Sequence, residues 1–360
     1  MAANGPENFR LTVLNPGGRD PDQQFHSVPG PGEGRHPPIN FHAFAACTLG
    51  AFHRDTRRAL AEKTPVLLLL RSDFRASERA LAELKKAGRA VAVSLKETGL
   101  HQIAQQLRDP AKLSRFTKIV TQAHGCIATT PEAAEIYQRV RSEGDPMETR
   151  RPCRAATVAF IPTPYPIEHQ GWDFSTSAND RSGIFIGTRE WDVPSRNHFA
   201  ALLVARQLCE TTGEPVTVVN LDGYKGRRLF GEVKFPDGKL RLIEKWKAYP
   251  DYLRDVARHK IVLQFDRSHV PGQVAGDALL CRVPCVGGDG AIERIAFSKT
   301  CGEGRTISEI ASMALDLLKN AELRKAVVAE SQERTLERLS FGAVRTQLTE
   351  FFDRLTRNYP

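Results

Sequence analysis

Short apolar runs alternate with amphipathic stretches along the first half of the chain. The run Pro65–Leu70 contains no charged residue, as expected for a strand that is covered on both faces. Strand-like and helix-like segments follow one another in the order that builds a parallel sheet. We expect strands at Phe9–Leu14, Pro65–Leu70, Ala90–Leu95, Gly125–Ala128 and Thr157–Ile161, and helices at His53–Glu62, Ser77–Ala87, Leu100–Leu107 and Pro131–Val140.

The same alternation restarts near residue 183 and predicts a second parallel sheet. The segment Lys225–Lys239 interrupts it, and Asp237-Gly238 within that segment favours the turn of a hairpin. We expect strands at Gly183–Ile186, Val216–Asn220, Leu240–Ile243 and Lys260–Phe265, and helices at Asn197–Thr211, Tyr249–Arg258, Ser308–Ala321, Glu322–Leu339 and Phe341–Leu355.

A proline-rich connector separates the two halves. Three prolines fall within Pro162–Pro166, which makes a stiff, extended segment. The chain has 360 residues, too many for one ordinary core. We therefore expect an N-terminal domain over residues 1–165, a C-terminal domain over 166–340 and a final helix over 341–360.

Charge and composition narrow the range of partners. The net charge of +9 fits an anionic ligand, an acidic membrane surface or nucleic acid. No RGG run, zinc-finger spacing or RNP-like aromatic strand is present, which argues against nucleic acid. The longest apolar run, Val66–Leu70, is far too short to span a membrane.

The seven scattered cysteines suggest reduced, buried thiols. The N-terminus has no apolar stretch after a basic start, so we expect no secretory signal. Both observations favour a cytoplasmic protein. The basic helix around His53–Arg58 leaves peripheral contact with the inner membrane face as an alternative to a solvated surface.

The stretch His269–Arg294 carries the clearest chemistry. It follows the strand Lys260–Phe265, and ligands of α/β proteins bind at the carboxyl ends of such strands. Gly272 and Gln273 open a helix whose first amides could bind a phosphate, although a plain turn is the alternative. Asp277, one turn later, could accept hydrogen bonds from a ribose or make a structural bond.

The order of these residues resembles the donor-binding region of retaining GT-B glycosyltransferases. The resemblance is to enzymes of the glycosyltransferase family 4-like type, also called glycosyl transferases group 1. An acidic residue opens the family pattern, and a second acidic residue, a proline, a glycine and a glutamate follow. The pattern falls on His269, Asp277-Ala278, Pro284, Gly290 and Glu293. Other segments match the family in the same order: Gly125–Glu132, Val158–Pro162, and Gly183–Arg189 with Arg196-Asn197. The resemblance therefore spans roughly residues 120–300.

The resemblance implies an α/β protein of the GT-B class, with two Rossmann-like domains whose parallel sheets face each other across a cleft. The N-terminal domain would hold the acceptor, the C-terminal domain the donor, and the last helix would cross back to the N-terminal domain. The implied reaction moves a sugar from a nucleotide-diphosphate sugar to a hydroxyl of a glycan, lipid or small molecule, with retention. No metal and no cofactor beyond this co-substrate is expected, because arginines and helix amides can neutralise the diphosphate.

The candidate site residues follow from these positions. As catalytic groups we expect Arg189, His269 and His42. Surface solvation for the arginines, and structural roles for the histidines, are the alternatives. The donor is expected at Gly187, Arg189, Arg196, Arg267, Ser268, Gly272, Gln273, Asp277, Gly290 and Glu293, and the acceptor at Asn40, His42, Lys96 and Glu97, with the strand end Arg71-Ser72-Asp73 as a further candidate by position.

One departure from the family pattern keeps a second class open. His269 stands where a carboxylate is usual, so a non-catalytic GT-B-like protein that binds a nucleotide or a glycan is the alternative. A GT-B epimerase is a third hypothesis. A GT-B phosphorylase would need a lysine that binds pyridoxal phosphate, and the sequence has no clear motif for one. Asp20-Pro21-Asp22 matches an Asp-x-Asp metal motif, which we interpret as chance. Donor, acceptor and oligomeric state stay open.

Overall fold

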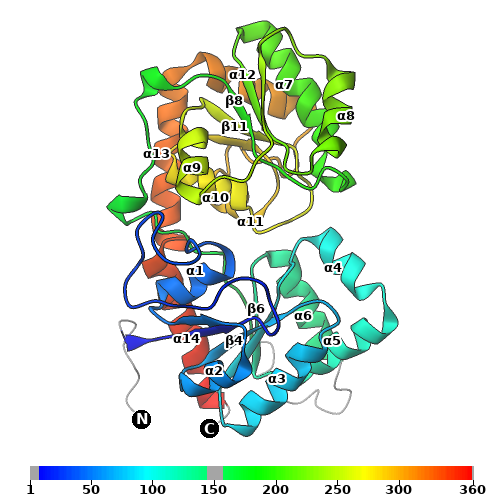
Figure 1. Cartoon of the computed structure of the whole chain (residues 1–360), viewed down its shortest axis with the longest axis vertical. Coiled ribbons are helices and arrows are strands. Elements are labelled where there is room, and N and C mark those ends of the chain that lie inside the picture. Colours follow the sequence, from blue (N-terminus) through cyan, green and yellow to red (C-terminus); the bar gives the residue numbers. More distant parts are fainter. Residues whose placement is uncertain (1–7, 144–156, 359–360) are drawn as a thin grey trace. The chain divides into compact units, whose positions relative to one another are not determined.

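The computed structural model describes residues 8–143 and 157–358. The chain forms two compact units, each with its own sheet. Unit 1 comprises residues 1–166 and 338–360, and unit 2 comprises residues 167–337. The blue and cyan parts of the ribbon and its red end therefore belong to unit 1, whereas the green helices α7 (His198–Thr212) and α8 (Tyr224–Val233) belong to unit 2 (Figure 1).

Unit 1 is built on a seven-stranded sheet in the order β2-β3-β1-β4-β5-β6-β7. All neighbours pair in parallel except β2, which runs antiparallel to β3 at the edge. The central strand β4 is buried along its whole length, as its apolar sequence predicts. The strands are β1 (Thr12–Leu14), β2 (Gln23–Gln24), β3 (Ala51–His53), β4 (Val66–Leu70), β5 (Val91–Leu95), β6 (Gly125–Ala128) and β7 (Val158–Phe160).

The connections between these strands are mostly helical. Their apolar residues recur at helical spacing and pack against the sheet, as Ala80, Leu81 and Leu84 do in α3. The helices of this part of unit 1 are α1 (Asn40–Cys47), α2 (Thr56–Ala61), α3 (Arg75–Lys86), α4 (Leu100–Leu107), α5 (Pro110–Gln122) and α6 (Pro131–Glu143).

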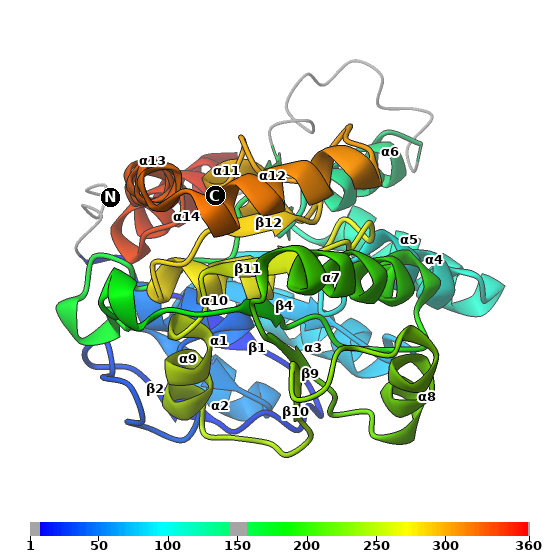
Figure 2. The same ribbon diagram turned by 90° about the horizontal axis from the view of Figure 1, so that it is seen from above.

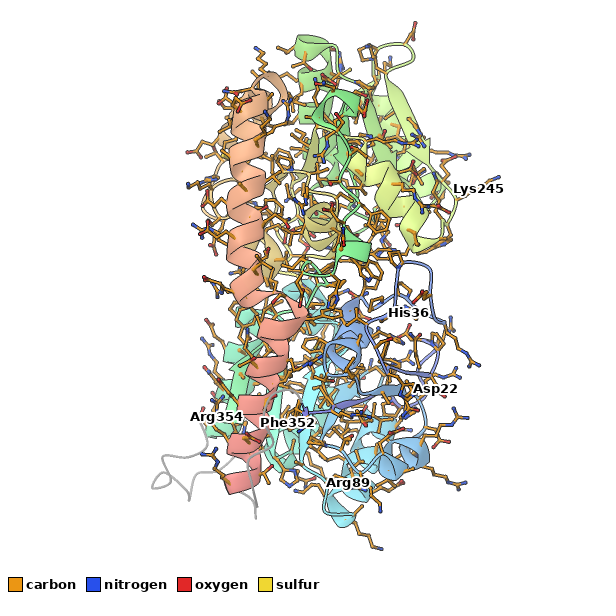
Figure 3. The ribbon with its side chains drawn as sticks, turned by 90° about the vertical axis from the view of Figure 1, so that its left-hand side faces the viewer. Asp22, His36, Arg89, Lys245, Phe352 and Arg354 are labelled. Atoms are coloured by element: carbon orange, nitrogen blue, oxygen red, sulfur yellow. The ribbon has the colours of Figure 1, made fainter. Side chains whose placement is uncertain are left out.

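The C-terminal helix α14 (Phe341–Asn358) completes the core of unit 1 and packs against α1. Its buried residues Val344, Leu348 and Phe352 recur at helical spacing. Phe352 contacts the ring of Phe9, whereas Arg354 on the other side of the helix is exposed (Figure 3). The helix therefore fills a face of the unit 1 sheet with residues from the far end of the sequence.

Unit 2 has a five-stranded sheet in the order β10-β9-β8-β11-β12, and every neighbouring pair is parallel. Helix α7 packs against α12, β9 and β11, and α9 packs against α10 (Figure 2). The strands are β8 (Ile184–Ile186), β9 (Val216–Val219), β10 (Leu240–Ile243), β11 (Ile261–Gln264) and β12 (Cys285–Gly287), and the helices are α7 (His198–Thr212), α8 (Tyr224–Val233), α9 (Tyr249–Ala257), α10 (Gln273–Leu280), α11 (Ala291–Ala296), α12 (Ile307–Lys319) and α13 (Ala321–Arg338).

Each sheet has a topological switch point, where the connections leave in opposite directions along the sheet. In unit 1 it lies between β1 and β4, because the chain continues from β1 to β3 on one side and from β4 to β5 on the other. In unit 2 it lies between β8 and β11 for the same reason. Crevices at such points are the usual ligand sites of doubly wound sheets.

The predicted hairpin at Lys225–Lys239 is wrong. Most of that segment forms helix α8, whose residues Gly226, Phe230 and Val233 are buried at helical spacing. Asp237-Gly238 does make a turn, but this turn leads into β10, which pairs in parallel with β9. The two glycines and the basic residues of α8 concealed its apolar stripe.

Helices α1 and α5 and strands β2 and β3 were not predicted from the sequence. Helix α5 begins with Asp109 accepting hydrogen bonds from Ala111 and Lys112, with Pro110 in the first turn. This Asp-Pro start is a known helix signal that could have identified it. Helix α1 and strand β3 form within a stretch of small and aromatic residues that has no clear period.

No helix in the described ranges has the length and apolar character that a membrane span requires. The six cysteines in these ranges are buried thiols. Cys153 lies outside the described residues.

Candidate functional site

The two strands at the switch point of unit 2 end in polar segments. β8 continues into Gly187–Arg189, and β11 continues into Phe265–Ser268. Because the strands pair in parallel, both segments leave the same edge of the sheet. The hydroxyl of Thr188 donates to the side-chain oxygen of Gln264 over 3.2 Å and ties the two strand ends together. The structure thus brings together two segments that the sequence predicts for donor binding.

Gly187 allows α10 to pack closely on the end of β8. A β-carbon at this position would lie 2.9 Å from Cγ1 of Val274 and 3.2 Å from the hydroxyl oxygen of Tyr252. Side chains rarely approach so closely, so a larger residue would displace α10. Gly187 therefore sets where the first turn of α10 lies relative to the strand end.

Gly272 precedes α10 with a φ of +94°, a conformation that favours glycine. It is buried, and a β-carbon there would collide with the carboxyl oxygen Oε2 of Glu293. The need for glycine at 272 thus has an intramolecular cause and does not by itself indicate a bound phosphate. Gln273 and Val274, the first residues of α10, are half-buried, and phosphate binding at this turn stays a prediction.

Glu293 is enclosed by the protein, with only 1% of its surface exposed. Its Oε1 accepts a hydrogen bond from Gln264 over 2.9 Å, whereas its buried Oε2 has no hydrogen-bond partner in the described part of the chain. A β-carbon at Gly290 would also collide with this carboxyl group. Burial raises the pKa of Glu293 to about 8, so the group is mostly a neutral acid at pH 7. The buried carboxyl group of Glu293 therefore offers no exposed surface for the predicted contact with the donor.

The buried acid Glu293 makes unit 2 less stable as the pH rises. Below about pH 4.5 it is protonated in both the folded and unfolded states, but between that pH and about 8 only the unfolded state gains by ionising. Its contribution therefore falls on the order of 4 kcal/mol across this window. We expect Glu293→Gln to flatten the loss of stability between pH 5 and 8, measured by urea unfolding, and Glu333→Gln at an exposed position to leave it unchanged.

Asp277, the predicted ribose contact, lies in a buried cluster with two tyrosines of α9. Tyr249 donates to its Oδ1 over 2.5 Å, and Tyr252 also interacts with the carboxyl group. Burial raises the pKa of Asp277 to about 7, although Tyr249 and the charge of Arg189 act in the opposite direction. Asp277 is only 2% exposed, so it positions the α9–α10 pair and leaves little surface for a ligand.

Arg189 is an exposed cation whose charge acts on the carboxyl group of Asp277. Its guanidinium lies 5.5 Å from the ring centre of Trp246, which is itself 77% exposed. Its backbone carbonyl accepts a hydrogen bond from Nε2 of His198 over 3.1 Å, which fixes the backbone at the end of β8. Arg189 forms no ion pair among the described residues, so its charge is available to a ligand.

The other predicted arginines are already engaged. Arg196 forms ion pairs with Asp266 and Glu190, and its side chain is 13% exposed. Arg267 donates to the backbone carbonyls of Gly302 and Arg305, which closes the loop before α12. These contacts argue against a diphosphate clamp at either residue, because a ligand would have to displace existing partners.

Ser268 is buried, and its hydroxyl shares a 2.7 Å hydrogen bond with the hydroxyl of Ser195. The two serines join the end of β11 to the segment before α7. Ser268 thus has a structural partner in the place where we expected a donor contact.

His269 lies beside a carboxyl group that the sequence did not indicate. Its backbone N–H donates to Oδ1 of Asp289 over 3.0 Å, and its Nε2 lies 3.5 Å from Oδ2. Burial raises the pKa of Asp289, and the bond from His269 opposes that rise. The pattern position where a carboxylate is usual is therefore occupied by a His–Asp pair, with Asp289 contributed by the Gly-Gly-Asp-Gly turn.

The acceptor candidates of unit 1 fall into two environments. His42 is buried between the rings of His36 and Phe52, and its Nε2 hydrogen-bonds the carbonyl of Pro21 over 3.0 Å. Burial lowers the pKa of His42 to about 3. A neutral, enclosed histidine of this kind argues against the predicted catalytic role. Asn40 begins α1 with a φ of +50° and is half-buried.

Lys96 and Glu97 line a cavity of about 470 Å³ at the carboxyl ends of β1, β4 and β5. Lys96 is half-buried and forms an ion pair of 3.1 Å with Asp20. Arg71 and Ser72, from the strand end noted in the sequence, line the same cavity. The structure therefore brings these acceptor candidates together at the switch point of unit 1.

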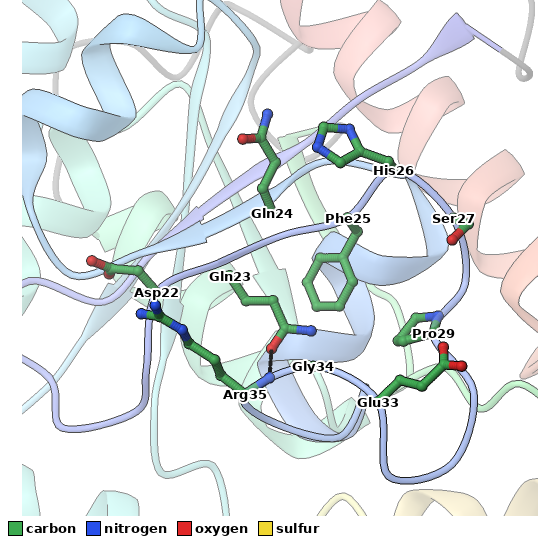
Figure 4. Close-up of a pocket in the computed structure, with 10 residues that line it drawn as sticks. All are labelled: Asp22, Gln23, Gln24, Phe25, His26, Ser27, Pro29, Glu33, Gly34 and Arg35. Carbon is green, nitrogen blue, oxygen red and sulfur yellow. Dashed lines mark hydrogen bonds between the residues drawn. The ribbon is translucent and has the colours of Figure 1, made fainter.

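A second cavity of unit 1, of about 480 Å³, lies along β2 and the loop that follows it (Figure 4). The side-chain oxygen of Gln23 accepts hydrogen bonds from the backbone of Arg35, over 3.1 Å, and of His36, over 2.9 Å. Glu33 similarly accepts from Gly30 over 2.7 Å. The polar groups here hold the loop in place, and none of them was a predicted site residue.

The two acids of the Asp-x-Asp match bind different cations. Asp20 pairs with Lys96, whereas Asp22 pairs with Arg54 and Arg58. Among the residues that the structure describes, no group of three or more His, Cys, Asp and Glu side chains is arranged to hold a metal ion.

No family model and no curated protein matches the chain. Solved structures do match. An α,α-trehalose-phosphate synthase (UDP-forming) from Burkholderia vietnamiensis aligns with a TM-score of 0.64 at 10% identity, covering 98% of each chain. A trehalose-6-phosphate synthase described as OtsA aligns with a TM-score of 0.61 at 12% identity, over 81% of this chain and 72% of that one.

Two further matches were solved with nucleotides. A trehalose-6-phosphate protein from E. coli, bound to UDP-2-fluoro glucose, aligns with a TM-score of 0.59 at 11% identity, over 82% of this chain and 77% of that one. S. aureus MnaA with UDP aligns with a TM-score of 0.50 at 14% identity, over 84% and 77%. Likenesses at such identities establish architecture. They confirm the fold that the motif resemblance predicted: the chain has the GT-B fold, with two Rossmann-like α/β units.

Proposed function

We propose that the protein transfers a sugar from a nucleotide-diphosphate sugar to a hydroxyl acceptor, with the donor bound at the β8–β11 switch point of unit 2. The observation that carries the proposal is Arg189. It is an exposed cation without an ion-pair partner in the described ranges, and it lies at the strand end beside the buried Asp277 cluster. Ligand sites of doubly wound sheets form at this position.

Arg189 would act on the leaving group. The acceptor oxygen forms a bond to the anomeric carbon while the bond from that carbon to the diphosphate oxygen breaks. The electron pair stays on the diphosphate, which also receives the acceptor proton. Negative charge therefore grows on the diphosphate, where a guanidinium stabilises it without a metal. Retention is part of the proposal and rests on the motif resemblance.

The remaining groups of this edge fit a nucleotide. The first turn of α10 begins beside the strand end, and the first amides of a helix, which lack partners within the helix, can bind an anion. The exposed ring of Trp246 next to Arg189 offers a flat face on which a base could stack. The names of the matched structures, which mention UDP and UDP-2-fluoro glucose, make uridine-diphosphate sugars the first donors to try.

The test is a panel of uridine-, guanosine- and adenosine-diphosphate sugars, with two readouts. Thermal protection reports binding, and release of the nucleoside diphosphate reports turnover. We expect one nucleotide class to protect the protein by several degrees and to be turned over once an acceptor is present. If no nucleotide of the panel protects the protein, the proposal fails.

The second candidate is a binding protein without turnover. It was suggested by His269, but the structure places the carboxyl group of Asp289 beside that histidine. The same panel separates the two functions: tight nucleotide binding without release of sugar in any acceptor mixture would favour the binding protein.

A further inference from the structure

The cavity at the switch point of unit 1 is strongly basic. Four of its lining residues, Arg19, Arg71, Lys96 and Lys112, carry positive charge, and two, Asp20 and Glu97, carry negative charge. They come from the segments that follow β1, β4 and β5 and from the start of α5. Residues distant in the sequence therefore converge on one cavity of about 470 Å³, a size usual for small-molecule sites.

The two carboxylates of the lining balance only half of this positive charge. Lys96 forms an ion pair with Asp20. Burial alone would raise the pKa of Asp20, but the charge and hydrogen bond of Lys96 act in the opposite direction, and the pKa is lowered. Arg71 donates to the backbone carbonyl of Gly17 over 2.7 Å and meets no carboxylate in the described ranges. Arg19 and Lys112 likewise form no ion pair there. With Asp20 paired to Lys96, Glu97 is the other carboxylate in the lining, so four cations against two carboxylates leave the cavity with a net charge of about +2.

The polar groups between the cations suit hydroxyls. The carboxylates of Asp20 and Glu97 can accept hydrogen bonds from hydroxyl groups, and Asn15 belongs to the same lining. The side chain of Asn15 donates to Asp20 over 3.2 Å, which holds that carboxylate at the cavity. The lining thus combines an anion-binding part with acceptors for hydroxyl groups.

We propose that this cavity binds a phosphate monoester of a hydroxyl-rich small molecule, and that this molecule is the acceptor in the transfer. The binding claim stands on the charges and shape of unit 1 alone, whereas the role as acceptor rests on the function proposed above. A phosphate with close to two negative charges matches the uncompensated arginine and lysine groups, which bind such oxygens in charge-assisted hydrogen bonds.

Calorimetric titration of the full chain with a hexose 6-phosphate, the matching hexose and inorganic phosphate tests the binding claim. We expect the hexose phosphate to bind, inorganic phosphate to bind more weakly and compete with it, and the hexose alone to bind at least about tenfold more weakly. Equal affinity for hexose and hexose phosphate, or no binding of either phosphate compound, would overturn the proposal.

Two variants locate the site. Lys112→Gln removes an unpaired charge, and Arg71→Gln removes a guanidinium that also holds Gly17. Each should weaken hexose phosphate binding by about tenfold, because each removes a charged hydrogen bond. The control Arg79→Gln changes an exposed arginine that lies outside the cavity lining and should leave binding unchanged. Unchanged affinity in Lys112→Gln and Arg71→Gln alike would contradict the proposed site.

A nucleotide titration of the same variants keeps the two proposals distinguishable. Nucleotide binding belongs to unit 2, so we expect both cavity variants to bind the nucleoside diphosphate as the parent chain does. Loss of hexose phosphate binding with intact nucleotide binding supports the cavity. Hexose phosphate binding without any nucleotide binding would leave the cavity in place and refute the transfer reaction.

Discussion

Replacing Arg189 with glutamine is expected to lower kcat/KM for the nucleotide-diphosphate sugar by about 100-fold. The guanidinium is the available cation at the β8–β11 switch point, and its charge matters most when the diphosphate departs. The main loss should therefore appear in kcat, measured by release of the nucleoside diphosphate, with a smaller rise in KM.

The matched control is Arg228→Gln on α8. Arg228 is also exposed, but it is not part of the strand ends of the switch point. Neither variant should change stability by more than about 0.5 kcal/mol, since both side chains lie on the surface. Equal kinetics in the Arg189 and Arg228 variants would show that Arg189 does not contact the donor.

Changing Gly287 to alanine is expected to destabilise unit 2 by about 4 kcal/mol or more. Gly287 ends β12 with a φ of +77°, and a β-carbon there would collide with the backbone carbonyl of Gln264 on β11. Because the obstacle is backbone, the strands must separate where they border the site. Urea unfolding and the yield of folded protein measure the effect.

Gly304→Ala separates the two causes of this loss. Gly304 has a similar φ of +70°, but a β-carbon there would meet no atom within 4 Å. This variant should lose only the backbone contribution, about 1 kcal/mol. If both variants lost the same stability, the packing of β12 against β11 would not be the cause.

The sheets of both units could be predicted because their strands are short apolar runs followed by helical patterns. Pro65–Leu70 has no polar residue that could face solvent, so a doubly covered strand was the natural prediction. Arg189 and Lys96 could then be placed because each follows a predicted strand. Helix α8 was not predicted because glycines interrupt its apolar stripe.

The state of the site residues could not be predicted, since it depends on partners distant in the sequence. From the sequence, Arg196 was expected to bind the donor phosphates. In the fold it pairs with Asp266, which lies 70 positions away in the sequence. Asp277 resembled an open ribose contact, but Tyr249 covers it. Spacing along the chain indicates where a group lies. Packing decides whether its charge is still available.

The central claim is that a nucleoside diphosphate binds where β8 and β11 end, beside the first turn of α10. Hydrogen–deuterium exchange with and without saturating uridine diphosphate tests it most directly, because it maps the bound segments. We predict slower exchange in Gly187–Arg189 and Gln273–Asp277, and loss of this protection in Arg189→Gln. Unchanged exchange in both segments, or protection confined to unit 1, would contradict the account.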